Sequence, residues 1–144
     1  MKAHGIFFYL CILFLSPLFA AKLEVISGDI YLKMDGKQVR LTEDGNNSEP
    51  SLSPSGEKIV FIHKNGRSQI VLLDLTSKAR EVILNEKADA EASKNMQEFS
   101  NLTFSDDTMI YFSTVAWVTS NAIHRLNIQT LKSSFVTDGN DYGS

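Results

Sequence analysis

The residue types that most often carry out chemistry are few in this sequence and widely spaced. After the first 20 residues there are two histidines, His63 and His124, and no cysteine. A zinc site needs such ligands at close spacing, so we interpret both histidines as strand or interface residues. The sequence has no Gly-x-Ser-x-Gly motif and no serine with an evident base partner. We therefore predict no enzymatic activity, no metal and no cofactor.

Two acidic stretches resemble functional motifs. Asp106 and Asp107 could form a pair of carboxylates, but in an internal repeat of the sequence they align with the turn at Pro54. We therefore expect them to be exposed turn residues. Residues 138–143 resemble the opening of a calcium loop, yet Tyr142 occupies the fifth ligand position and the sequence stops before the bidentate Glu of the twelfth. We expect no calcium site there.

Trp117 is the only tryptophan, and it lies within the unusual stretch 112–120, FSTVAWVTS. A large, rigid aromatic side chain can anchor a protein partner. It can equally fill the space between adjacent sheets. Packing in the core is the favoured interpretation, and Trp117 is the one candidate partner-binding residue.

The elements that must position these residues are predicted to be β-strands. Within residues 46–85, Pro54 and Gly56 favour a tight turn, and Asn65-Gly66 is typical of a two-residue hairpin. The runs between the turns are rich in β-branched and aromatic residues. They predict strands over 50–53, 58–63, 69–74 and 80–84. The segment therefore codes for a four-stranded antiparallel meander.

This pattern repeats along the chain. Residues 53–61 recur as 105–112, and residues 70–77 recur as 123–130, at a spacing of about 53. Blades of β-propellers typically have periods of roughly 40 to 50 residues, so the excess indicates an insert. Two further strands are predicted ahead of both copies, over 28–32 and 38–42. The predicted units are a half blade over 21–45, a blade over 46–85, an insert over 86–100 and a degenerate blade over 101–140.

The repeat resembles a known family. Leu41-Thr42, followed by PSLSPSGEKIVF at 50–61 and IVLLDL at 70–75, is similar to the propeller repeat of TolB-like periplasmic proteins. Related repeats occur in propellers of prolyl-oligopeptidase-type enzymes. The resemblance implies an all-β fold, an open and partial β-propeller of about two and a half blades. It also implies a non-enzymatic module that mediates protein–protein interaction in the cell envelope. Two alternatives stay open: a truncated fragment or remnant of a longer propeller without independent activity, and a small-ligand-binding propeller.

The first 20 residues are predicted to be a secretory signal peptide. Lys2 is a minimal basic region, residues 6–15 are apolar, and small residues suited to cleavage end at Ala21. We therefore expect a periplasmic protein, with an extracellular or membrane-anchored protein as the alternative. An uncleaved leader would be its only membrane contact.

Charge narrows the class of partner. Lys2 is the only basic residue among the first 20, so the remaining chain has 13 basic and 17 acidic side chains, a net charge of −4. This balance argues against a nucleic-acid partner. The partners that remain are an envelope protein or a second copy of the chain.

Two further expectations concern packing. Residues 85–100 are rich in Ala, Glu, Lys and Met and predict a short surface helix, interpreted as a solvated crossover, with an inserted recognition element as the alternative. Apolar side chains of the first blade are expected to pack against the second blade, which can cover them only in part. The apolar surface left exposed is expected to cause self-association. On the first blade these side chains are Ile59, Phe61, Val71 and Leu73, and on the second Ile110, Phe112, Ile123 and Leu126.

Overall fold

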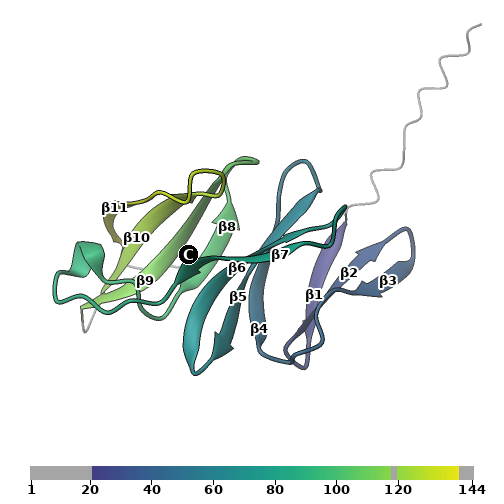
Figure 1. Cartoon of the computed structure of the whole chain (residues 1–144), viewed down its shortest axis with the longest axis horizontal. Helices are drawn as coiled ribbons and strands as arrows, with labels where there is room; N and C mark the ends of the chain where they lie inside the picture. Colours follow the sequence, from purple (N-terminus) through teal and green to yellow (C-terminus); the bar gives the residue numbers. More distant parts are fainter. Residues whose placement is uncertain (1–20, 118–119, 140–144) are drawn as a thin grey trace, which may run out of the picture.

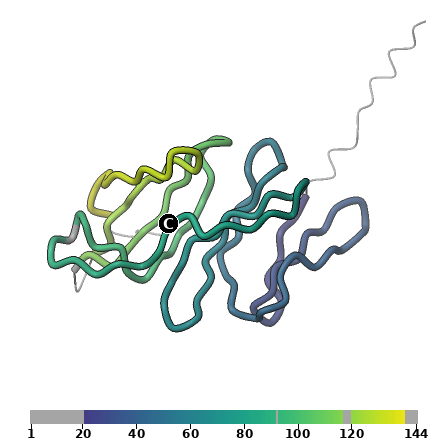
Figure 2. The backbone as a smooth tube through the Cα atoms, in the orientation of Figure 1, coloured from purple at the N-terminus to yellow at the C-terminus, as the bar shows by residue number. Residues whose placement is uncertain are grey.

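A computed structural model describes residues 21–117 and 120–139. Their strands form three antiparallel sheets that follow one another in chain order (Figures 1 and 2). The N-terminal sheet contains β1 (Lys22–Ile26), β2 (Asp29–Met34) and β3 (Lys37–Arg40). The central sheet contains β4 (Asn47–Leu52), β5 (Lys58–Asn65), β6 (Arg67–Asp74) and β7 (Arg80–Asn85). The C-terminal sheet contains β8 (Ser100–Phe104), β9 (Met109–Trp117), β10 (Ser120–Asn127) and β11 (Ser133–Gly139). The predicted all-β fold of antiparallel meanders is confirmed.

Local turn chemistry explains the order of the strands. The hairpin between β1 and β2 turns at Ser27-Gly28, with φ of 52° and 79°, and the hairpin between β2 and β3 turns at Asp35-Gly36, with φ of 54° and 71°. Two successive positive φ angles are typical of the type I′ turn, which matches the twist of the flanking strands. β1, which precedes the first of these turns, is a strand that was not predicted from the sequence.

The helix predicted over residues 85–100 is wrong. Among the described residues this segment has one 3₁₀ turn, η1 (Ala92–Lys94), and otherwise loops back on itself. The amide of Lys87 donates to the carbonyl of Met96 at 2.8 Å, and the amide of Met96 donates to the carbonyl of Lys87 at 2.8 Å. Helix propensity is a weak preference in so short a segment, and tertiary hydrogen bonds override it.

The central sheet is buried on both faces, because successive side chains of a strand point to opposite sides. One core cluster lies between the N-terminal and central sheets and contains Ile30, Ile59, Phe61, Val71 and Leu73. The other lies between the central and C-terminal sheets and contains Val60, Ile62, Ile70, Ile83, Phe99, Leu102, Ile110, Phe112, Leu126 and Ile128. The expected packing of the Phe61 face against the second blade is therefore wrong, since that face packs on the N-terminal sheet.

The outward face of the C-terminal sheet is more polar than the repeat predicts. The core members Phe112 and Leu126 point toward the central sheet, so the alternate residues point away from it. Where the central sheet has Val60, Ile62, Ile70 and Leu72, this outward face has Tyr111, Ser113, Ile123 and Arg125. Ile123, expected in the core, thus lies on the outward face.

The outward face of the N-terminal sheet is polar as well. It carries Glu24, Tyr31, Lys33 and Arg40, and Lys33 Nζ lies 2.5 Å from the Glu24 carboxylate. Large apolar side chains are nevertheless exposed on both sheets, among them Val25, Met34 and Val39 on the N-terminal sheet and Phe135 and Val136 on the C-terminal sheet. The expected self-association therefore stays a prediction. Among the described residues no helix has the length and apolar character to span a membrane.

Candidate functional site

The two histidines lie in different sheets and have separate structural roles. His63, in β5, places Nδ1 3.0 Å from Asn47 Oδ1 and 3.6 Å from the Asp44 carboxylate. His124, in β10, is fully buried, with Nε2 2.9 Å from Thr114 Oγ1. Burial lowers the pKa of His124, so its ring is neutral near pH 7. Over residues 21–117 and 120–139, no three His, Cys, Asp or Glu side chains gather as metal ligands would.

The carboxylates of Asp106 and Asp107 are turn groups. Asp106 Oδ1 accepts hydrogen bonds from the amides of Thr108 and Met109, each at 2.8 Å. The amide of Thr108 in particular lowers the pKa of Asp106, so it is a charged turn residue. Asp107 Oδ1 accepts from the amide of Ser55 at 2.8 Å and so links the turns of two successive sheets.

The remaining sequence candidates lie at the limit of the described chain. The backbone of Trp117 pairs with Ser120 at the end of β9, and its side chain is outside the described residues. Partner contact through Trp117 therefore stays a prediction. Within the stretch that resembled a calcium loop, Asp138 and Gly139 belong to β11 and pair with β10. The rest of that stretch is outside the described residues.

The structure brings functional groups together around residues 86–99, here called the insert loop. Glu86 fixes both ends of this loop: its Oε2 accepts from the amide of Ser68 at 2.9 Å, and its Oε1 accepts from the amide of Glu98 at 3.0 Å. Burial opposes ionisation, but these two N–H groups hold the pKa of Glu86 below its ordinary value. The charged carboxylate is therefore a structural clamp.

A second clamp joins the insert loop to the C-terminal sheet. Asn95 is buried, and its Nδ2 donates to the carbonyl of Val115 at 2.6 Å. The amide of Val115 in turn donates to the carbonyl of Gln97 at 3.1 Å. The loop is thus attached to both the central and the C-terminal sheets.

A hollow of about 540 Å³, here called the basic cleft, lies between the insert loop and the β5–β6 hairpin. Its lining comprises Lys64, Gly66, Arg67, Glu86, Lys87, Ala88, Gln97 and Glu98. In the part of the chain that the structure describes, none of the cations Lys64, Arg67 and Lys87 forms an ion pair within 4.0 Å. The cleft thus presents cations with free hydrogen-bonding capacity.

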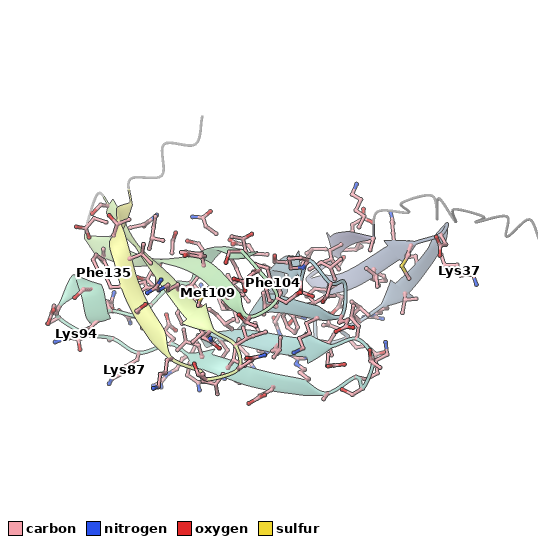
Figure 3. All side chains as sticks on the ribbon, turned by 90° about the horizontal axis from the view of Figure 1, so that it is seen from above. Lys37, Lys87, Lys94, Phe104, Met109 and Phe135 are labelled. Atoms are coloured by element: carbon pink, nitrogen blue, oxygen red, sulfur yellow. The ribbon has the colours of Figure 1, made fainter. Side chains whose placement is uncertain are left out.

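A hollow of about 410 Å³, here called the apolar hollow, lies between the insert loop, the end of β7 and the start of β11. Its lining comprises Leu84, Asn85, Lys87, Asp89, Ser93, Lys94, Met96, Ser133, Ser134 and Phe135. Leu84 and Met96 pack on the core between the central and C-terminal sheets, whereas Phe135 is 40% exposed. Figure 3 shows Lys87, Lys94 and Phe135 at one end of the molecule and Lys37 at the other. Lys87 lines both hollows, so the two adjoin at this residue.

The sequence predicts the insert from the long repeat period, with a solvated crossover as the favoured interpretation and an inserted recognition element as the alternative. It does not predict the two hollows. One signal could have located the cleft: a connection that leaves the fourth strand of a meander starts beside the hairpin between the second and third strands. The basic pair Lys64 and Arg67 flanks that hairpin.

Comparison with known proteins identifies the fold. No protein-family model matches the chain, and no curated protein matches it. The crystal structure of TolB from Acinetobacter baumannii is similar, with a TM-score of 0.59 and 19% identity over 76% of this chain and 26% of that one. The acylaminoacyl peptidase of Pyrococcus horikoshii is similar too, with a TM-score of 0.58 and 17% identity over 86% of this chain and 23% of that one.

The β-propeller domain of the Trilobed protease from Pyrococcus furiosus has a TM-score of 0.52 and 15% identity over 78% of this chain and 34% of that one. The chain therefore spans about a quarter to a third of the length of these structures. Identities this low establish the fold alone. The chain has the fold of a partial TolB-like β-propeller, with three consecutive sheets.

Proposed function

We propose that the chain is a non-enzymatic, periplasmic interaction module that binds a protein of the cell envelope through the insert loop. The observation that supports this proposal is the pair of adjoining hollows, one basic and one apolar, on a loop clamped by Glu86 and Asn95. Preformed surfaces of mixed character suit protein recognition, because little ordering is required on binding. The separate structural roles of His63, His124 and Asp106 are consistent with a module that carries out no reaction.

Site-specific photocrosslinking in the native host tests this function. A benzoylphenylalanine is incorporated at Ala88, which lines the basic cleft, or at Lys37, which is exposed at the opposite end of the molecule. We expect one dominant envelope protein to be crosslinked from Ala88 and not from Lys37. Equal crosslinking from both positions, or none from Ala88, would reject the insert loop as the binding surface.

The proposed location requires export. Mass spectrometry of the protein recovered from the periplasmic fraction is expected to show an N-terminus near Ala20 or Ala21, because residues 16–21 have the pattern of a cleavage site. An intact Met1 on protein recovered from the membrane fraction would instead indicate an anchored protein. It would leave the interaction surface unaffected.

A second candidate is a chain that acts only as part of a larger propeller. The observation favouring it is coverage, since the chain matches 26% of the TolB structure and 34% of the Pyrococcus furiosus propeller domain. Light scattering on the purified protein separates the two candidates.

A further inference from the structure

We infer that the insert loop recognises an extended peptide segment of its partner, one that places a carboxylate in the basic cleft and a neighbouring large apolar side chain in the apolar hollow. This inference rests on the proposed function and specifies the chemistry of the partner. It is carried by three features of the described residues: the charge of the cleft, the character of the hollow beside it, and the hydrogen bonds that hold the insert loop.

The charge of the basic cleft is opposite to that of the chain as a whole. Three cations and two carboxylates line it, whereas the chain has a net charge of −3. Glu86 accepts two backbone hydrogen bonds, stays charged and attracts Lys64 and Arg67, so the three cations and two carboxylates leave the lining with a net charge of +1. The guanidinium of Arg67 can bind a carboxylate through two parallel hydrogen bonds, and Lys64 and Lys87 can supply further donors. An anionic group is therefore the complementary ligand.

The apolar hollow determines which kind of anion fits. Phe135, Leu84 and Met96 offer an apolar surface next to the cleft, and Lys87 borders both. A free phosphate or a sugar phosphate would leave this surface uncovered. A nucleic acid would be repelled by the net negative charge of the chain. A peptide that has an acidic residue beside a large apolar residue satisfies both hollows at once.

The arrangement of the loop makes this recognition selective. The Glu86 clamp attaches the loop to β6, and the Asn95 clamp attaches it to β9. The backbone that carries Lys87 and Met96 is therefore fixed by hydrogen bonds before binding. Preorganisation of this kind reduces the ordering cost of association and favours a ligand of matching spacing.

The experiment is an NMR titration of the purified protein with three probes. The probes are N-acetyl-Phe-Glu-amide, its neutral analogue N-acetyl-Phe-Gln-amide, and N-acetyl-Gly-Glu-amide, which lacks the apolar side chain. We expect the amide resonances of Gly66 and Ala88 to change in chemical shift when the first probe is added. Each of the other two probes is expected to bind about tenfold more weakly, since each lacks one of the two complementary groups.

Variants of the chain connect the binding to the cleft. Arg67→Gln combined with Lys87→Gln is expected to weaken binding of N-acetyl-Phe-Glu-amide by about tenfold or more. Lys37→Gln, at the opposite end of the molecule, is the matched control and is expected to leave the affinity unchanged. All three side chains are exposed, so the variants retain the fold, which the dispersion of the same spectra verifies.

Three outcomes would overturn the inference. The first is equal affinity for the glutamyl and glutaminyl probes, and the second is an equal loss of affinity in Lys37→Gln. The third is full competition by inorganic phosphate together with no gain from the phenylalanine, which would mark a simple anion site. If the crosslink from Ala88 forms but the peptide probes do not bind, the peptide inference fails while the proposed function stands.

Discussion

Gly28→Ala should weaken the junction between the N-terminal sheet and the central sheet. Gly28 has φ of +79°, and a Cβ added there would lie 2.0 Å from the carbonyl oxygen of Gly45 and 2.5 Å from its carbonyl carbon. Both are backbone atoms, so no side-chain rotation can relieve the overlap. The Gly28 carbonyl also accepts hydrogen bonds from the amide of Asn47 at 2.8 Å and from its Nδ2 at 3.1 Å. The turn therefore cannot move away without breaking this junction.

Gly36→Ala is the matched control. Gly36 has φ of +71° and also occupies the second position of a type I′ hairpin turn, but a Cβ there would have no heavy atom within 4 Å. Each substitution costs about 1–2 kcal/mol for placing alanine in the left-handed region. Gly28→Ala must in addition displace the Gly45 backbone, a steric cost of about 1–3 kcal/mol. We expect Gly28→Ala to be more destabilising than the control by about that additional amount.

Urea unfolding followed by circular dichroism measures this difference as a change in the free energy of unfolding. Hydrogen exchange at the amide of Asn47 reports the same junction locally, and protection there is expected to fall in Gly28→Ala and to persist in Gly36→Ala. Equal destabilisation by the two substitutions, with protection of Asn47 retained, would refute the docking of the β1–β2 turn on the loop that precedes β4.

Three further predictions concern the clamp, the buried histidine and the size of the protein. Glu86→Ala is expected to raise the rate of hydrogen exchange at the amides of Ser68 and Glu98. Because the fold lowers the pKa of Glu86, the carboxylate stabilises the protein above about pH 4.5, the ordinary pKa of the group, and this effect is lost as the pH falls. Because burial lowers the pKa of His124 from its ordinary 6.5, the unfolded chain binds a proton at this histidine more readily than the folded chain does. The melting temperature should therefore decrease as the pH is lowered below about 6.5, and it should decrease less in His124→Phe. Light scattering on the purified protein at micromolar concentration should find an oligomer, since Val25, Met34 and Val39 of the N-terminal sheet are 40%, 47% and 50% exposed. A monomer would refute the self-association expected from sequence.

Much of the strand order could be predicted, because the signals are local. Pro54 and Gly56 determine one turn, Asn65-Gly66 determines the next, and both act within a few residues of chain. The structure has strands on either side of each turn, as predicted. The prediction of a helix over residues 85–100 failed for the converse reason. Composition described the propensity of the segment, whereas the hydrogen bonds between Lys87 and Met96 decided its conformation.

The sequence by itself determined the all-β class, the repeated meander and the long connection between the second and third sheets, because alternation of side chains and turn residues act over short distances. Only the tertiary structure decided which face of each strand meets which neighbour: Phe61 and Val60 are adjacent in sequence but belong to different cores. It also decided the basic cleft, which Arg67, Lys87 and Glu98 line together. These residues come together because Glu86 binds the amides of Ser68 and Glu98 at once, a contact between segments that no local pattern encodes.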